Sequence, residues 1–300
     1  MSVLVIGSVA LDTIKTPFDK AEEILGGAAS YFSFAARHFG EVAMVAVVGE
    51  DFPAAHVKLF EKNGIDTTGL ETVPGRTFRW VGEYGQDFNT RKTLDTQLNV
   101  FADFDPKLTP EHRASKSVFL ANIHPELQLC VLEQVQNPEL VALDTMNYWI
   151  EGSRDALLEV LRRVDAVVMN DEETRLLTGE SNLLQASRAV LALGPSLVVV
   201  KKGEHGALVV SEDFIFSAPA YPVESVYDPT GAGDTFAGGF LGYLAACEDH
   251  RKESEIRCAT AYGIVVASFA VESFSLTRLA EVTREDIESR FVYLRNMSRF

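Results

Sequence analysis

A glycine-rich turn that leads directly into a helix is the feature that most constrains this chain. Residues 228–234 read Asp-Pro-Thr-Gly-Ala-Gly-Asp, and small residues there allow a tight turn. Apolar residues then recur at helical spacing, at Phe236, Phe240, Tyr243, Leu244 and Cys247. The pattern predicts that residues 231–234 lie at a helix N-terminus, where free N–H groups and the helix dipole favour an anion.

A carboxylate, Asp234, stands in that first turn. A site that holds a phosphate and a carboxylate together suits phosphoryl transfer. The N–H groups of Gly231, Ala232 and Gly233 would stabilise the moving phosphoryl group, and Asp234 would accept the proton of the attacking hydroxyl. The alternative interpretation is that Asp234 only caps the helix.

The string from Asp228 to Phe240 closely resembles the C-terminal signature of the ribokinase-like (PfkB-type) carbohydrate and nucleoside kinases. The N-terminal signature of that family is partly matched by Gly26-Gly27-Ala-Ala-Ser-Tyr31, then by Gly40 and by Gly49-Glu-Asp51. The resemblance implies one kinase domain over residues 1–300. It also implies an α/β fold, a three-layer α/β/α sandwich with a mostly parallel central sheet and a small β lid.

Composition excludes several other classes. The chain has 27 basic and 43 acidic residues and a net charge of −16, which argues against nucleic acid or an anionic membrane as a partner. With 47% hydrophobic residues, a sizeable core is expected. No apolar run approaches the ~20 residues of a membrane span and no secretory signal pattern is present, so we expect a cytoplasmic protein.

Short apolar runs alternate with helical segments. Strands are predicted at 3–6, 42–48, 117–120, 141–143, 166–169, 197–201, 207–210 and 214–217. Helices are predicted at 28–39, 54–63, 125–135, 153–163, 172–178, 183–193, 232–247, 254–271 and 283–295. The central strands are apolar without alternation, as expected for a parallel sheet that helices cover on both faces.

One segment breaks this rhythm. Residues 76–84 and 91–98 alternate partly and flank a Gly/Asp/Asn turn, which predicts a hairpin. The resemblance places the family's β lid at about 76–100, with 13–25 as a candidate second part. The lid edge could pair with a second chain in a homodimer. The alternative is an ordinary edge hairpin.

The nucleotide site must use loops other than a P-loop, because no Walker A or dinucleotide fingerprint is present. Residues 201–206 read Lys-Lys-Gly-Glu-His-Gly and follow a buried strand. The resemblance implies that Lys202, Gly203 and Gly206 bind the nucleotide, with ATP as co-substrate. A plain β-turn is the alternative.

Two further motifs suggest cations. Asn170 and Glu173 match the family's Asn-x-x-Glu motif, which implies nucleotide contact by Asn170 and water-mediated Mg²⁺ binding by Glu173. The alternative is a helix N-cap with acidic first-turn residues. In some relatives the positions of Asp228 and Thr230 help to hold a monovalent cation such as K⁺. Ser275 stands where many relatives have glycine, which puts potassium activation in doubt.

The acceptor side departs from the family pattern. The resemblance implies that Asp12, Gly26 and Gly27 bind the acceptor. Relatives often carry an asparagine where this chain has Tyr31. A tyrosine offers one hydroxyl on an apolar ring, so a base or a differently arranged polyol becomes more plausible than a simple sugar.

Other candidates for acceptor binding lie at strand ends, where open α/β sheets place ligands, or on the lid. They are Arg79, Arg91, Asn122, Asp144 and Asn147. Each of them has a structural role as its alternative.

These observations predict an ATP-dependent phosphotransferase. It would move the γ-phosphoryl of Mg·ATP to a hydroxyl of a small sugar or cyclitol, with Asp234 as base. The alternatives are a nucleoside (adenosine-like) kinase of the same fold, or a catalytically silent ligand-binding homologue.

Overall fold

The computed structural model describes residues 2–86, 88 and 91–299, and within them the strands form two sheets. The larger sheet has nine strands. In sheet order they are β13 (Ile215–Ala218), β12 (Ala207–Ser211), β11 (Leu197–Lys201), β10 (Ala166–Asn170), β9 (Leu140–Asp144), β8 (Ser117–Leu120), β1 (Ser2–Ile6), β4 (Glu41–Gly49) and β5 (Ile65–Val73).

The sheet is parallel from β5 through to β11, and β12 and β13 add an antiparallel edge. This confirms the predicted mostly parallel sheet. The prediction missed β5, because its sequence IDTTGLETV is too polar to read as a buried strand. Strand β13 begins and ends one residue later than predicted.

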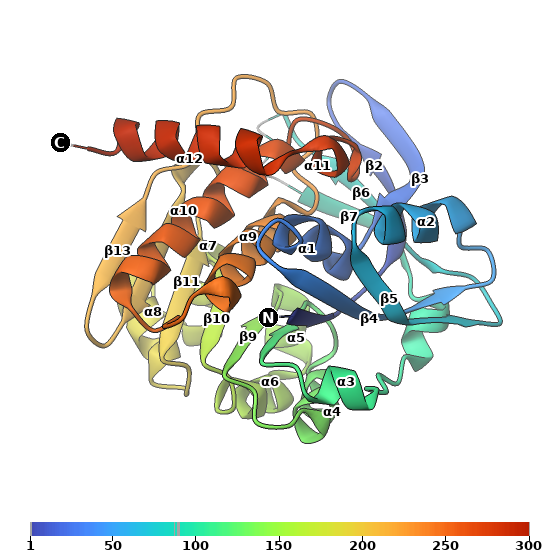
Figure 1. Ribbon diagram of the computed structural model, residues 1–300, viewed down its shortest axis with the longest axis horizontal. Helices are drawn as coiled ribbons and strands as arrows, with labels where there is room; N and C mark the ends of the chain where they lie inside the picture. The colour runs from blue at the N-terminus through green and yellow to red at the C-terminus, as the bar shows by residue number, and fades with distance from the viewer. Residues whose placement is uncertain (1, 87, 89–90, 300) are drawn as a thin grey trace.

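Helices cover both faces of this sheet (Figure 1). One layer contains α1 (Ala28–Ala36), α2 (Ala54–Lys62), α9 (Ala232–Ala246), α10 (Glu253–Ala270), α11 (Thr277–Glu281) and α12 (Arg284–Met297). The other contains α3 (Pro110–Arg113), α4 (Pro125–Gln134), α5 (Asn147–Gly152), α6 (Arg154–Leu161), α7 (Asp171–Thr178) and α8 (Leu183–Leu191). The short helices α3, α5 and α11 were not predicted, because a helix of one or two turns leaves almost no periodic signal.

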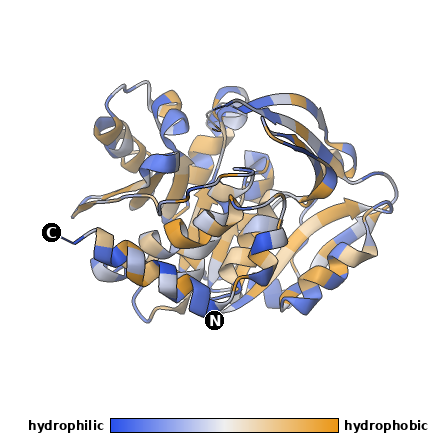
Figure 2. Cartoon of the chain, turned by 90° about the horizontal axis from the view of Figure 1, so that it is seen from above, coloured by the Kyte–Doolittle hydropathy of each residue, from blue (hydrophilic) through white to orange (hydrophobic). Residues whose placement is uncertain are grey.

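Alternation along the strands builds two cores. Val3 and Val5 of β1 face the first helix layer, and Leu4 and Ile6 face the second. The central strands are therefore apolar on both sides, as their colouring in Figure 2 shows.

A second sheet of four strands forms the lid, in the order β3-β2-β6-β7. Strands β6 (Phe78–Tyr84) and β7 (Arg91–Gln97) are the predicted antiparallel hairpin, although part of its turn (87 and 89–90) lies outside the described residues. Strands β2 (Ala10–Lys15) and β3 (Lys20–Gly26) complete the sheet. Two 3₁₀ helices, η1 (Asn99–Asp103) and η2 (Gly203–His205), follow β7 and β11.

The strand order reverses beside β1. The chain moves from β1 outward to β5, and then from β8 in the opposite direction to β13. Ligands in open α/β sheets bind at the carboxyl ends of strands beside such a reversal. The lid strand β2 begins just after the end of β1, so the fold carries Asp12 to this crevice.

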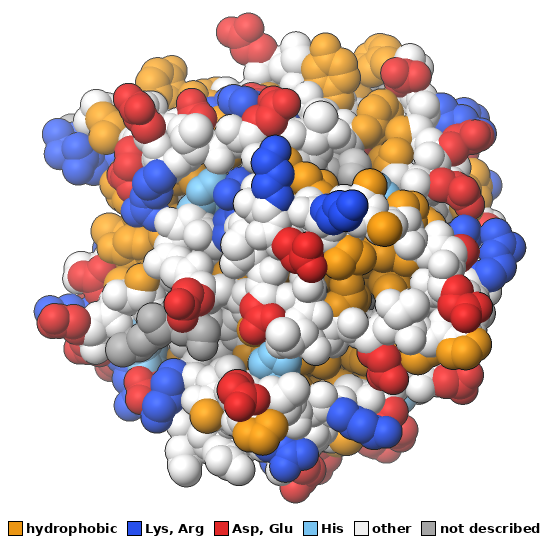
Figure 3. Space-filling view, turned by 45° about the vertical axis from the view of Figure 1, so that its right-hand side comes forward, with side chains coloured by type: hydrophobic (Ala, Val, Ile, Leu, Met, Phe, Trp, Pro, Cys, Tyr) orange, Lys and Arg blue, Asp and Glu red, His pale blue; other side chains and the backbone are white. Residues whose placement is uncertain are grey.

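Within the described residues, no helix is long and apolar enough to cross a membrane. Acidic and basic side chains are interspersed over the face seen in Figure 3, beside apolar ones.

Candidate active site

The glycine-rich turn forms the N-terminus of α9, as predicted. Gly231 is the N-cap and has a left-handed backbone with φ of 73°. A Cβ atom there would also lie 2.3 Å from the ring of Tyr31, so a side chain would be both strained and obstructed. Thr235 donates the first helical hydrogen bond, to the Gly231 carbonyl at 2.8 Å. The amides of Gly233 and Asp234 precede it and belong to the helix end that favours an anion.

Asp234 lies half-buried in the first turn of α9. Removal from water, followed by the nearby Asp144 carboxylate, raises the pKa of Asp234 to about 7. Lys201 and Arg91 act in the opposite direction and lower that pKa. A carboxyl group whose pKa lies near neutrality can take up a proton during a reaction and release it afterwards.

Asp12 lies on β2, and its side chain is packed against the glycine pair. It is 4% exposed, and a Cβ atom at Gly26 would fall 1.9 Å from its Oδ2 atom. Burial, followed by the charges of Asp228 and Asp234, raises the pKa of Asp12 to about 8, and the Gly27 amide opposes this. At neutral pH this carboxyl group is largely protonated, so it can donate as well as accept hydrogen bonds.

Tyr31 is fully buried on α1, with its ring against Gly231. Its hydroxyl group has no hydrogen-bond partner among the described residues. Burial and the charges of Asp228 and Asp12 raise the pKa of Tyr31 well above its usual value, so the hydroxyl stays neutral. The structure therefore places Tyr31 with the predicted acceptor residues.

Sequence reasoning missed Tyr84, at the end of lid strand β6. The Thr230 hydroxyl donates to the Tyr84 hydroxyl at 3.0 Å, and the Thr230 amide donates to Asp228 Oδ1 at 2.9 Å. Tyr84 is 8% exposed. The lid is thus bonded directly to the turn that leads into α9. No local signal marks this contact, because Tyr84 and Thr230 are 146 positions apart.

Asp228 is buried, and the Thr230 amide donates a hydrogen bond to its Oδ1 atom. Its Oδ2 atom has no partner among the described residues. Burial raises the pKa of Asp228 to about 6. An unpaired buried oxygen fits the predicted monovalent cation, which would supply the missing positive charge.

Asp144, predicted to bind the acceptor, forms an ion pair with Lys201. Its Oδ2 atom lies 2.8 Å from Lys201 Nζ, and its Oδ1 atom accepts from the Thr145 amide at 2.7 Å. Sequence reasoning chose Lys202 and not Lys201 as the cation of the 201–206 loop. In that loop Gly203 and Gly206 both have positive φ, of 52° and 84°.

Asn170 and Glu173 form a capping box at the start of α7. The Glu173 amide donates to Asn170 Oδ1, and the Asn170 amide donates to Glu173 Oε2, both at 2.7 Å. Burial raises the pKa of Glu173 to about 7, while Lys201 lowers it. Within the described residues, no three His, Cys, Asp or Glu side chains are placed to hold a metal ion together.

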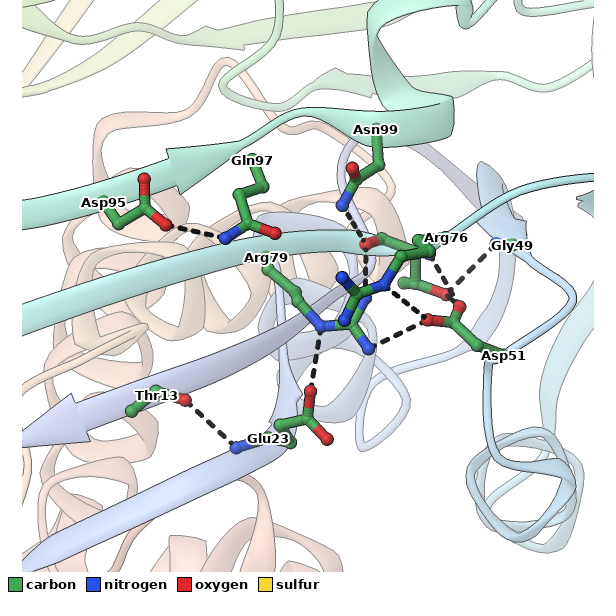
Figure 4. Close-up of polar contacts among 10 residues, drawn as sticks. Thr13, Glu23, Gly49, Asp51, Arg76, Arg79, Asp95, Gln97 and Asn99 are labelled. Carbon is green, nitrogen blue, oxygen red and sulfur yellow. Dashed lines mark hydrogen bonds and ion pairs between the residues drawn. The ribbon is translucent and has the colours of Figure 1, made fainter.

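Arg79 belongs to a network between lid and core (Figure 4). Its guanidinium group binds Glu23 of β3 at 2.9 Å and Asp51, after β4, at 2.8 Å. Asp51 also accepts from the amide and hydroxyl of Thr77, each at 2.7 Å. Arg79 therefore lies in the junction between lid and core, and its side chain is only 12% exposed.

The remaining candidates differ in position. The Arg91 guanidinium group lies over the Trp80 ring, 5.6 Å from its centroid. Its charge lowers the pKa of Asp234 and of Glu173. Asn122 accepts from the Trp149 indole at 2.9 Å, so part of its amide is already occupied. Asn147 begins α5 and accepts from the Tyr148 amide at 3.0 Å.

This geometry brings the N-terminus of α9, with Asp234 in its first turn, near the buried carboxyl group of Asp12. A family model described as pfkB family carbohydrate kinase matches residues 2–282. The chain belongs to the pfkB kinase family. It is a small-molecule kinase with the ribokinase-like fold.

A cytidine kinase from Thermococcus kodakarensis is 32% identical over 250 residues, which cover 81% of this chain and 88% of that protein. Two crystal structures share the fold. The nucleoside kinase of Methanocaldococcus jannaschii has a TM-score of 0.77 at 21% identity, over 97% of this chain and 98% of that one. An E. coli protein described as a ribokinase II, in complex with ATP and Mg²⁺, has a TM-score of 0.76 at 22% identity, over 97% and 99%.

Proposed function

We propose that this kinase transfers the γ-phosphoryl group of Mg·ATP to a hydroxyl of a nucleoside. The observation that carries the proposal is the 32% identity to a cytidine kinase over most of both chains. Sequence reasoning ranked a sugar or cyclitol first and a nucleoside second, and the comparisons favour the second. An intact Asp234 and an intact anion-binding turn argue against a silent binding protein.

Each half of the site has a distinct role in this proposal. The acceptor hydroxyl lies between Asp12 and Asp234, with Gly26, Gly27 and Tyr31 against the sugar. The 231–234 amides hold the phosphoryl group, and the loop with Lys202, Gly203 and Gly206 holds the nucleotide. Asn170 would contact the nucleotide, and Glu173 would hold waters of a bound Mg²⁺, which would offset the charge of the phosphates. Asp228 and Thr230 would help to hold a monovalent cation beside the turn.

Asp234 acts late in the reaction. Even with its raised pKa, it is far too weak a base to ionise an alcohol beforehand. It orients the hydroxyl and takes its proton as the bond to phosphorus forms in a loose transition state. Closure of the lid excludes water, which would otherwise compete as the acceptor.

The test measures ADP release with Mg·ATP across cytidine, other nucleosides, free sugars and inositols. We expect turnover with nucleosides, cytidine among them, and little with free sugars. Turnover with a sugar or cyclitol alone would favour the sugar or cyclitol kinase that the sequence first predicted. ATP binding without turnover on any acceptor would favour the silent binder. Sedimentation of the same protein would test whether it forms the homodimer that an exposed lid edge would allow.

A further inference from the structure

The ion pair between Lys201 and Asp144 has no role in the reaction described so far. Lys201 ends β11 and Asp144 ends β9, so both residues lie at the carboxyl ends of the parallel strands. Their side chains are 17% and 5% exposed, and Nζ and Oδ2 are 2.8 Å apart. A buried ion pair seldom adds stability compared with apolar residues of similar size, so stability alone is a weak reason for this one.

The Lys201 ammonium group lies against the first turn of α9. A Cβ atom at Gly233 would be 3.0 Å from Lys201 Nζ, and glycine is the residue that leaves this space open. The ammonium charge also acts on Glu173 and Asp234. Lys201 is therefore a fixed positive charge beside the amides that bind the anion, and Asp144 keeps it there.

We propose that Lys201, held in place by Asp144, supplies positive charge that stabilises the transferring phosphoryl group at the 231–234 turn. The proposal rests on the phosphoryl position given under the proposed function. The acceptor oxygen forms a bond to the γ-phosphorus while the bond from that phosphorus to the β–γ bridging oxygen breaks. The acceptor proton passes to Asp234, and Lys201 remains protonated throughout. Asp144 is a positioning residue.

A fixed charge in a water-poor site is worth most where negative charge is redistributed during the reaction. Lys201→Met should therefore lower kcat with cytidine and Mg·ATP by about 100-fold, with little change in the KM for cytidine. Lys116→Met is the matched control, because Lys116 forms an exposed pair with Glu139 at the amino-terminal ends of β8 and β9, far from the carboxyl ends where Lys201 lies. A kcat within about threefold of wild type for Lys201→Met would overturn the proposal.

Folding must be separated from catalysis, since Lys201→Met leaves Asp144 buried without a partner. The double variant Lys201→Gln with Asp144→Asn replaces the ion pair by two neutral amides that can still bond. Its melting temperature should return towards that of wild type, while its kcat stays about 100-fold low. Recovery of kcat together with melting temperature would show that the pair is only structural.

A second measurement does not depend on the acceptor. Calorimetry would compare Mg·AMP-PNP, which carries a γ-phosphoryl group, with Mg·ADP, which does not. Lys201→Met should weaken binding of the first by about tenfold and leave the second unchanged. Equal effects on both nucleotides would refute the role at the γ-phosphoryl. If wild type does not phosphorylate nucleosides, the proposed function fails, and this comparison still decides the role of Lys201.

The pH profile provides a third readout. Asp234 faces Lys201, Asp144 of β9 and Arg91 of β7, and its charge in turn reaches Asp12 of β2 and Tyr31 of α1. Because Lys201 lowers the pKa of Asp234, its removal should move the acid limb of kcat to higher pH. An unmoved limb would contradict the placement of the ammonium group beside the reacting atoms.

Discussion

The carboxylates in the proposed donor half of the site lie near positive charges, and those in the proposed acceptor half do not to the same extent. On the donor side, the Lys201 charge interacts with the carboxylates of Asp144, Glu173 and Asp234. The Arg91 charge lowers the pKa of both Glu173 and Asp234. On the acceptor side, the pKa of Asp12 is set by burial, by two other carboxylates and by one amide. Burial raises the pKa of Asp228, and hydrogen bonding from Thr230 lowers it.

The difference indicates what each half still needs from its ligand. In the proposed reaction, the donor half would present the fixed positive charge of Lys201 to the phosphates before the nucleotide binds. The acceptor half holds Asp12 protonated, and it leaves the Tyr31 hydroxyl and one Asp228 oxygen without partners among the described residues. Acceptor hydroxyls and a cation would satisfy those groups.

The largest effect is expected from Asp234→Asn. The variant keeps the shape of the side chain and removes the proton acceptor, so kcat should fall by about a thousandfold with little loss of stability. Steady-state kinetics with cytidine and thermal unfolding would measure both. Asp213→Asn, in the exposed turn before β13, is the control. A loss of less than about tenfold would exclude Asp234 as the base.

The next effect concerns pH. With the pKa of Asp234 near 7, the fraction ionised falls as pH falls, so kcat/KM should drop by about tenfold per pH unit on the acid side. Initial rates at saturating Mg·ATP would measure the limb. A rate that stays constant down to about pH 5.5 would be inconsistent with the environment described for Asp234.

Asp12→Asn should change how the free energy of unfolding depends on pH. The pKa of Asp12 is about 8 in the folded protein and 3.8 in the unfolded chain. Between about pH 4 and about pH 8, folding is therefore accompanied by uptake of a proton. Its stabilising contribution is present below about pH 4 and is lost as pH rises towards 8. The ligand-free variant should therefore lose less stability over that interval and exceed wild type at pH 8 by on the order of 2 kcal/mol, although activity falls.

Denaturant unfolding without ligands at acid and alkaline pH would measure that difference. Asp19→Asn, in the exposed turn between β2 and β3, is a matched control on the same lid. Parallel pH dependence in wild type and Asp12→Asn would show that Asp12 is not held protonated.

The smallest effect is expected at the lid contact. Tyr84→Phe removes the partner of the Thr230 hydroxyl, at a cost of about 1 kcal/mol, or about fivefold in kcat/KM. Thr230→Val should have a similar effect, and the double variant should be no worse than the more impaired single one. Additive losses would mean that the two hydroxyl groups act separately.

The sequence specified what depends on neighbours along the chain. Strands β8 and β11 have the predicted bounds, because each is a short buried apolar run with clear ends. The left-handed Gly231 and the start of α9 follow from a local pattern of small residues before an apolar helical stripe. The fold and the kinase family could be read from this level.

Contacts between distant segments were beyond the reach of such patterns. Nothing near Tyr84 indicates that it bonds Thr230, and nothing near Arg79 indicates a pairing with Asp51 and Glu23. Lys201 ends β11 and Lys202 lies just beyond it, so only the tertiary structure decided which of the two lysines pairs with Asp144. Local backbone preference and periodicity are encoded over a few residues. The pairing and pKa of a buried charge depend on every element packed around it.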